Sequence, residues 1–168
     1  MESILVKATF RGMPDSVDIL NVYGPYKNRE SFWEKVRRGG LLNSPNLILG
    51  GDLNLTLRAS ETWGKKAVID PLSSHFNLFF YSMGLVDIAS INTEPTWRNG
   101  RVGSDGINKK IDCFLIASSL IPTLQYHRVW THPSDISDHY PICFEWNKSI
   151  VSCNYPFKFN RSWLKDQD

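Results

Sequence analysis

The sequence predicts a mixed α/β fold in which most strands pair in antiparallel fashion. Segments rich in β-branched and aromatic residues alternate with two segments of helical periodicity, but no regular strand–helix–strand repeat links them. The chain has 168 residues, of which 42% are hydrophobic and 21% are charged, so it is long enough for one domain with a sizeable core. A doubly wound parallel sheet is the less favoured architecture.

Two strands joined by a turn are predicted at the start of the chain. Residues 3–10 and 17–24 are rich in the side chains that favour strands. The stretch RGMPDS between them contains Gly, Pro, Asp and Ser, which are typical of turns. We therefore expect a β-hairpin.

Two helices are predicted from apolar side chains that recur every three or four residues. The first begins near Pro25 and Asn28 and ends at Gly39 and Gly40. The second ends near Gly84. We interpret their apolar stripes as core, and these consist of Phe32, Trp33 and Val36 in the first helix and Leu72, Phe76, Phe79, Phe80 and Met83 in the second.

Carboxylates stand next to three further predicted strands. The apolar stretch PNLILGG predicts a buried strand that ends at Asp52. Another strand begins near Lys110 and contains Asp112, and a third, YPICFEW, follows Asp138 and His139. The stretch YHRVW predicts one more strand, and EPTWRNGRVGSDG is interpreted as a basic, glycine-rich loop.

These acidic residues define a candidate site, because the ends of neighbouring strands converge at one edge of a sheet. Carboxylates there, with Asn54 and His139, could bind a hard divalent ion such as Mg²⁺ and hold a phosphodiester. Each residue also has a plain structural interpretation. Asp52 could be a turn acid, Asp112 an ion-pair partner of the neighbouring lysines, and His139 an exposed histidine.

Composition narrows the class of protein. The net charge of +2 is too weak to predict a nucleic-acid partner by itself, and no apolar run is long enough to span a membrane. The opening MESILVKATF has neither a basic leader nor a long apolar segment, so no secretory signal is expected. Cys113, Cys143 and Cys153 lack metal-type spacing, which favours reduced thiols in an intracellular protein, with the nucleus as a candidate compartment.

Four motifs, in this order, resemble the endonuclease/exonuclease/phosphatase family: NVYGP, GGDLN, KIDCFLIASSL and SDHYPI. The similarity runs from about Ile4 to Trp146, and EPTWRNG and YPFKFNRSWL are most similar to plant LINE-type (non-LTR) retrotransposon endonuclease domains. The resemblance implies a DNase I-like four-layer α/β sandwich of mixed, largely antiparallel sheets. It divides the chain into a partial domain at residues 1–147 and a linker, or the start of a following region, at residues 148–168.

The same resemblance implies catalytic roles for five residues. Tyr23 would contact the scissile phosphate. Asp52 would orient or deprotonate the attacking water, and Asn54 would hydrogen-bond the phosphate and help to hold that water. Asp112 would pair with His139 and fix its ring, and His139 would stabilise charge that develops on a phosphate oxygen.

Metal and nucleic-acid contacts are implied in the same way. Asp138 would lie at the metal ion, Mg²⁺ or Mn²⁺, together with Asp52 and Asn54. Trp97 and Arg98 would lie against DNA, where a ring can stack and a guanidinium can meet phosphate. Simple packing is an equal interpretation of Trp97.

The beginning of the chain departs from the family pattern. The family's first strands carry an asparagine near the site and a glutamate that is a principal metal ligand, and nothing before NVYGP matches either. We therefore expect an N-terminally truncated domain that lacks its first strands. Its metal binding would be weakened, a sheet edge with some apolar surface would be exposed, and its activity would be weak or absent.

Three functions stay open at this point. The first is a metal-dependent phosphodiesterase or endonuclease that acts on nucleic acid and derives from a retrotransposon. The second is a phosphoesterase for a small or lipid phosphate, which the lack of an amphipathic membrane-facing stretch disfavours. The third is a non-catalytic nucleic-acid-binding or structural remnant. The basic side chains that would support binding are Arg37, Arg38, Lys65, Lys66, Lys109 and Lys110.

Overall fold

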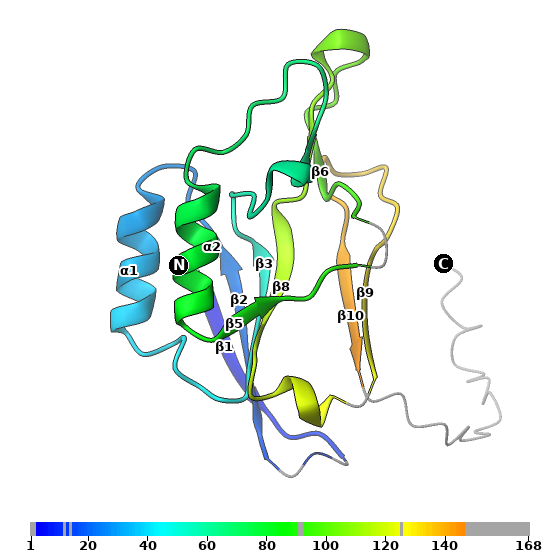
Figure 1. Cartoon of the computed structure of the whole chain (residues 1–168). Coiled ribbons are helices and arrows are strands. Elements are labelled where there is room, and N and C mark those ends of the chain that lie inside the picture. Colours follow the sequence, from blue (N-terminus) through cyan, green and yellow to red (C-terminus); the bar gives the residue numbers. More distant parts are fainter. Residues whose placement is uncertain (1–2, 12, 14, 91–92, 125, 147–168) are drawn as a thin grey trace, which may run out of the picture.

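The computed structural model describes residues 3–146 except 12, 14, 91–92 and 125, and it shows a mixed α/β fold (Figure 1). The largest sheet has the strand order β1 (Ser3–Ala8), β2 (Val17–Tyr23), β3 (Leu47–Asp52), β8 (Asp112–Ala117) and β5 (Leu85–Asp87). β9 (His127–Thr131) and β10 (Ile142–Trp146) form a second sheet. A small third sheet contains β4 (Thr62–Trp63), β7 (Asn108–Lys109) and β6 (Trp97–Arg98). The region 148–168 lies outside the described residues.

The five-stranded sheet is mixed, as the sequence predicted. β2 and β3 are parallel, and every other neighbouring pair in this sheet is antiparallel. Parallel neighbours need a crossover connection, and helix α1 (Arg29–Arg38) supplies it between β2 and β3. The predicted hairpin is also present, because β1 and β2 pair in antiparallel fashion across the turn segment.

Both predicted helices are present. α1 starts after Asn28, whose φ of 55° is left-handed, and the chain turns away after it at Gly40, whose φ is 74°. α2 (Ser73–Ser82) is followed by Gly84 with a φ of 70°. Neither helix is long and apolar enough to cross a membrane.

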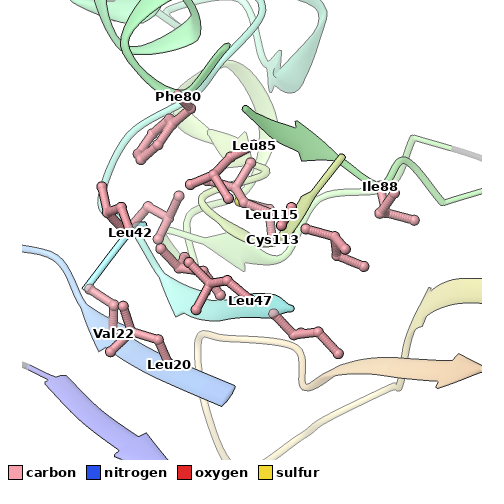
Figure 2. Close-up of a cluster of buried hydrophobic side chains, with 14 of the residues drawn as sticks. Leu20, Val22, Leu42, Leu47, Phe80, Leu85, Ile88, Cys113 and Leu115 are labelled. Carbon is pink, nitrogen blue, oxygen red and sulfur yellow. The ribbon is translucent and has the colours of Figure 1, made fainter. Parts of the chain in front are cut away.

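The helices pack side by side on one face of the five-stranded sheet (Figure 1). Trp33 of α1 is fully buried and meets Phe80 of α2 edge to face, with 4.8 Å between the ring centroids. Below them lies a layer of fully buried aliphatic side chains from the sheet, part of which Figure 2 shows. That layer includes Leu20, Leu47, Leu49 and Leu115.

The second sheet covers the opposite face of the five-stranded sheet. Phe114 of β8 and Phe144 of β10 have ring centroids 5.3 Å apart. Gly50 in β3 makes room for this layer, because a Cβ added there would lie only 2.6 Å from the Phe114 ring. The described residues therefore form three layers of the predicted sandwich: the helices, the five-stranded sheet and the pair β9–β10.

β1 forms the outer edge of the five-stranded sheet. Its Ile4, Leu5 and Val6 side chains are 58, 47 and 50% exposed, which is high for apolar residues in a strand. Among the described residues, β2 is the strand that pairs with it. Within the described part of the chain, the sheet therefore has an unpaired, apolar edge on the side away from β8 and β5.

Four short strands were not predicted. β4, β6 and β7 have two residues each, and β5 has three, so none is long enough to show an alternating pattern. The segment EPTWRNG, interpreted as loop, contains β6. Asp87 ends β5 and pairs with Arg58 and Lys110. Pairing between distant segments creates these strands, and local sequence does not encode it.

Replacing Phe80 by alanine should lower the free energy of unfolding by about 3 to 5 kcal/mol, because the ring fills the space between α2 and Trp33. Urea denaturation followed by circular dichroism measures this loss. Tyr81→Ala on the same helix is the matched control, since Tyr81 is 77% exposed and should cost less than about 0.5 kcal/mol. Equal losses for the two variants would contradict the placement of α2.

Candidate active site

The register of three neighbouring strands aligns three of the predicted site residues. β2 ends at Tyr23, β3 ends at Asp52, and β8 begins at Asp112. Tyr23 lies directly opposite Asp52, and Asp52 lies directly opposite Asp112. Directly opposed residues project from the same face of a sheet. The three side chains therefore stand in a row at the end of the sheet where β3 stops, the upper end in Figure 1.

His139 joins this row from a distant segment. Its Nδ1 lies 3.1 Å from Asp112 Oδ2, and its Nε2 lies 3.9 Å from Asp52 Oδ2. A ladder-type bridge between His139 and Trp97 of β6 fixes the backbone at this point. The imidazole thus lies between two carboxylates, and the structure brings Asp112 and His139 together as the resemblance implied.

Asn54 closes the turn that follows β3. Its backbone N–H donates to Asp52 Oδ1 at 2.8 Å, and its side-chain Nδ2 donates to the Gly24 carbonyl at 2.7 Å. Its φ of 52° is left-handed, which asparagine tolerates. Gly24 is required beside this turn, because a Cβ there would lie 2.4 Å from the Leu53 carbonyl oxygen. The YGP and GGDLN motifs therefore pack against each other.

An ion pair behind the turn holds it to both helices. Arg29, the first residue of α1, donates to the Asn54 carbonyl at 3.2 Å and to both carboxylate oxygens of Asp70. Asp70 in turn accepts from the backbone N–H of Leu72, immediately before α2. Burial raises the pKa of Asp70, but the hydrogen bonds from Arg29 and Leu72, together with the charges of Arg29 and Lys109, outweigh it, so the pKa lies below its ordinary value. Sequence reasoning missed this pair because its members are 41 residues apart.

Burial and the neighbouring charges raise the pKa of both carboxylates of the site. Burial, with added repulsion from Asp112 and Asp138, raises the pKa of Asp52 to about 6. The pKa of Asp112 is also raised, first by burial and further by Asp138, although His139 opposes the shift. A divalent cation would relieve this repulsion. Asp52, Asp112 and His139 offer ligand atoms within 4.8 Å of one another, so this donor set fits a metal ion.

Asp138 and Arg98 lie beside this group and not in it. Asp138 Oδ2 accepts a hydrogen bond of 2.9 Å from the indole Nε1 of Trp97. Arg98 donates to the Ser134 carbonyl at 3.2 Å, and its guanidinium lies 5.2 Å from the centre of the Tyr140 ring. Tyr23, at the end of the row, is 65% exposed. Metal binding by Asp138 and Asn54, and DNA binding by Trp97 and Arg98, stay predictions.

A buried ion network behind the site involves a residue that sequence reasoning treated as surface. Lys110 pairs with Glu61 at 3.1 Å and with Asp87 at 3.1 Å, so it is not a partner of Asp112 and does not offer a surface for nucleic acid. Arg58 also contacts both of these acids. The predicted surface cations Arg37 and Arg38 both pair with Glu34.

Thr96 is a site residue that the sequence did not reveal. It is almost fully buried, and its hydroxyl accepts from the backbone N–H groups of Ile111 and Asp112, both at 3.0 Å. It thereby fixes the point at which β8 enters the site. A threonine before a tryptophan carries no distinctive sequence signal for this role. Cys113 and Cys143 are free thiols, as expected, and burial raises the pKa of Cys113.

Comparison with solved structures identifies the fold. The chain is similar to the endonuclease domain of TRAS1, a telomere-specific non-LTR retrotransposon, with a TM-score of 0.65 and 21% identity over 86% of this chain. It is similar to the 3′ phosphatase NExo from Neisseria bound to a product DNA hairpin, with a TM-score of 0.60 and 21% identity over 85%. It is also similar to an AP endonuclease from Archaeoglobus fulgidus, with a TM-score of 0.61 and 16% identity over 85% of this chain.

The chain therefore has a DNase I-like fold. It spans 63 to 65% of the length of these three structures. The sequence matches no protein-family model and no curated protein. The expected truncation stays a prediction.

Asp70→Asn should lower the free energy of unfolding at pH 7 by about 2 to 3 kcal/mol, because it removes the charge that Arg29 binds while the Leu72 cap is kept. The pKa of Asp70 is depressed, so the native chain holds this stabilisation above the unfolded pKa of about 3.9. It loses the stabilisation as the pH falls through the lower folded pKa. Denaturation at a series of pH values from 7 to 2 should show the difference in free energy of unfolding between wild type and Asp70→Asn becoming smaller.

The exposed pair Lys66–Asp105 provides the control for this experiment. Its side chains are 67 and 51% exposed, so Asp105→Asn should change the free energy of unfolding by less than about 1 kcal/mol at any pH. If Asp70→Asn were as mild as Asp105→Asn at pH 7, the role of Arg29 in holding the turn would be refuted.

Proposed function

We propose that this chain is a metal-dependent phosphodiesterase domain of the endonuclease type that acts on DNA. The observation that carries the proposal is the row formed by Tyr23, Asp52 and Asp112 across three strands, closed by His139 at 3.1 Å from Asp112. Two largely buried carboxylates, an imidazole and an exposed phenol at one end of the sheet form a compact site for a phosphate group.

Each residue has a task that its contacts support. Asp52 is held by the Asn54 backbone N–H through one oxygen and leaves the other toward His139, so it can accept a proton from an attacking water. His139 is oriented by Asp112 through Nδ1, which directs Nε2 toward the space beside Asp52. There it would hydrogen-bond a phosphate oxygen and stabilise charge that develops during cleavage. Tyr23, at the open end of the row, would contact the same phosphate.

A divalent cation, Mg²⁺ or Mn²⁺, would be held by the Asp52 carboxylate, with Asp138 and Asn54 as the predicted neighbours. When bound, such an ion neutralises phosphate charge and lowers the pKa of a coordinated water. The raised pKa values of Asp52 and Asp112 are consistent with a cation at this place, because burial and, to a smaller extent, repulsion from neighbouring carboxylates both disfavour a negative charge that a cation would neutralise. Mg²⁺ prefers oxygen ligands, which favours the carboxylates over the imidazole.

We further propose that the chain derives from a retrotransposon and acts within the nucleus. The likeness to the TRAS1 endonuclease domain supports this origin, as do the motifs EPTWRNG and YPFKFNRSWL. The likeness to NExo, solved with a DNA hairpin, supports DNA as substrate. We expect weak activity from the given residues alone, since those before Tyr23 include no match to the family's glutamate ligand.

Nicking of supercoiled plasmid and of a duplex with one abasic site tests the proposal. Wild-type chain with Mg²⁺ or Mn²⁺ should cleave slowly, EDTA should abolish cleavage, and added metal should restore it. Asp52→Asn should reduce the rate by about 10² to 10⁴, the usual worth of a positioned base. Asp15→Asn is the matched control, because Asp15 is exposed and lies at the opposite end of β2 from Tyr23.

His139→Ala should also reduce the rate by about 10²-fold or more without loss of the fold, since the ring is one-third exposed and not part of the core. Circular dichroism and thermal unfolding check the fold, and the same nicking assay measures the rate. Folded wild-type protein that gives no metal-dependent cleavage would overturn the proposed activity. Salt-dependent DNA binding without cleavage would instead identify a non-catalytic binding domain.

A further inference from the structure

We propose that Trp97 is a positioning residue for Asp138: its indole N–H holds the Asp138 carboxylate beside the candidate site, and the ring does not act as a stacking surface for nucleic acid. The inference deepens the proposed function and rests on it for its catalytic consequence. The contact itself is a property of the chain alone. It therefore has a test that does not depend on activity.

Three contacts join Trp97 and its neighbour to the segment that carries Asp138. The indole Nε1 donates to Asp138 Oδ2 at 2.9 Å. The backbone of Trp97 forms a bridge with His139, and the Arg98 N–H donates to the Asp138 carbonyl at 2.9 Å. An indole N–H can only donate and an ionised carboxylate can only accept, so Trp97 is the donor and Asp138 the acceptor of a charge-assisted hydrogen bond.

The residues on both sides of Trp97 serve the same arrangement. Thr96 accepts from the backbone N–H of Asp112 through its hydroxyl and from Tyr140 through its carbonyl, the latter at 2.7 Å. Three consecutive residues, Thr96 to Arg98, thus connect the start of β8 with the segment 138–140. Because this segment contacts the backbone of both Asp112 and His139, it sets the distance between these two residues.

Arg98 anchors the loop before Asp138. Its guanidinium donates to the Ser134 carbonyl and lies over the Tyr140 ring, so both ends of the segment 134–140 are attached to one side chain. The middle of that segment is open, and Ile136 is 99% exposed. An acidic side chain on such an open loop would sample several rotamers without a partner. The indole contact therefore limits the freedom of Asp138.

The hydrogen bond between Trp97 and Asp138 is better explained as orienting the Asp138 carboxylate than as stabilising the fold. Asp138 is exposed, and a hydrogen bond to an exposed carboxylate contributes little to folding. Its charge nevertheless reaches the site, because it raises the pKa of both Asp52 and Asp112. Holding the Asp138 carboxylate in one orientation would therefore affect the affinity of the site for a cation. Groups that orient metal-binding residues typically contribute 10- to 100-fold to metal affinity or activity.

NMR of the metal-free protein labelled with ¹⁵N tests the contact directly. Trp97→Phe identifies the Trp97 indole N–H signal. Asp138→Ala should move that signal more than any other indole signal and speed its exchange with solvent, whereas Asp15→Ala should leave it unchanged. If Asp138→Ala left the Trp97 signal in place, the proposal would be overturned, whether or not the chain cleaves DNA.

Two variants separate positioning from stacking. Trp97→Phe removes the N–H and keeps a flat ring, and Trp97→Leu removes both. Positioning predicts that both variants lower kcat and Mn²⁺ affinity by about 10-fold or more, with an unchanged KM for DNA. Stacking predicts that Trp97→Phe resembles wild type and that Trp97→Leu raises KM.

Trp130→Phe is the matched control for these variants. It makes the same replacement in β9, where the ring contacts Arg128, and should change neither kcat nor Mn²⁺ affinity. Mn²⁺ affinity is measured by calorimetry on folded protein. A wild-type chain that binds Mn²⁺ but never cleaves would defeat the proposed function while the NMR and calorimetry results still decide the role of Trp97. Full activity and metal affinity in Trp97→Phe would refute the positioning role.

Discussion

The backbone pairing of β2, β3 and β8 is the constraint on which the site depends. A parallel ladder sets Tyr23 opposite Asp52, and an antiparallel ladder sets Asp52 opposite Asp112. A slip of one residue in either ladder would turn one side chain to the opposite face of the sheet. Buried leucines along β3 and β8 prevent such a slip, since they would have to enter the wrong layer. The core and the site are thus specified by the same register.

The ends of these strands need support that the ladders do not give. Arg29 and Asp70 hold the turn after β3, Thr96 holds the entry of β8, and the network of Lys110, Glu61 and Asp87 fills the space behind it. Each support joins segments far apart in the sequence. Buried charges of this kind cost solvation, so they persist where several hydrogen bonds satisfy them together.

Much of the fold followed from local pattern. The helices of Trp33 and Phe80, the buried strand before Asp52 and the hairpin all show periodicity or turn residues that elementary rules detect. The short strands could not be predicted in this way, because two residues such as Trp97 and Arg98 are too few to show an alternating pattern. The candidate site was foreseeable as a set of carboxylates beside strands and through the resemblance of its motifs. The residues that support the site, Thr96 and Arg29, could not be predicted, because their roles depend on contacts with distant segments that form only in the folded chain.

The outer strand β1 has a geometric consequence for anything that joins the sheet there. Strand addition extends a sheet sideways by about 4.8 Å for each new strand. Because β1 is separated from β3 by β2, such growth proceeds away from Asp52. The backbone edge of β1 would be paired while the row of Tyr23, Asp52 and Asp112 stayed uncovered.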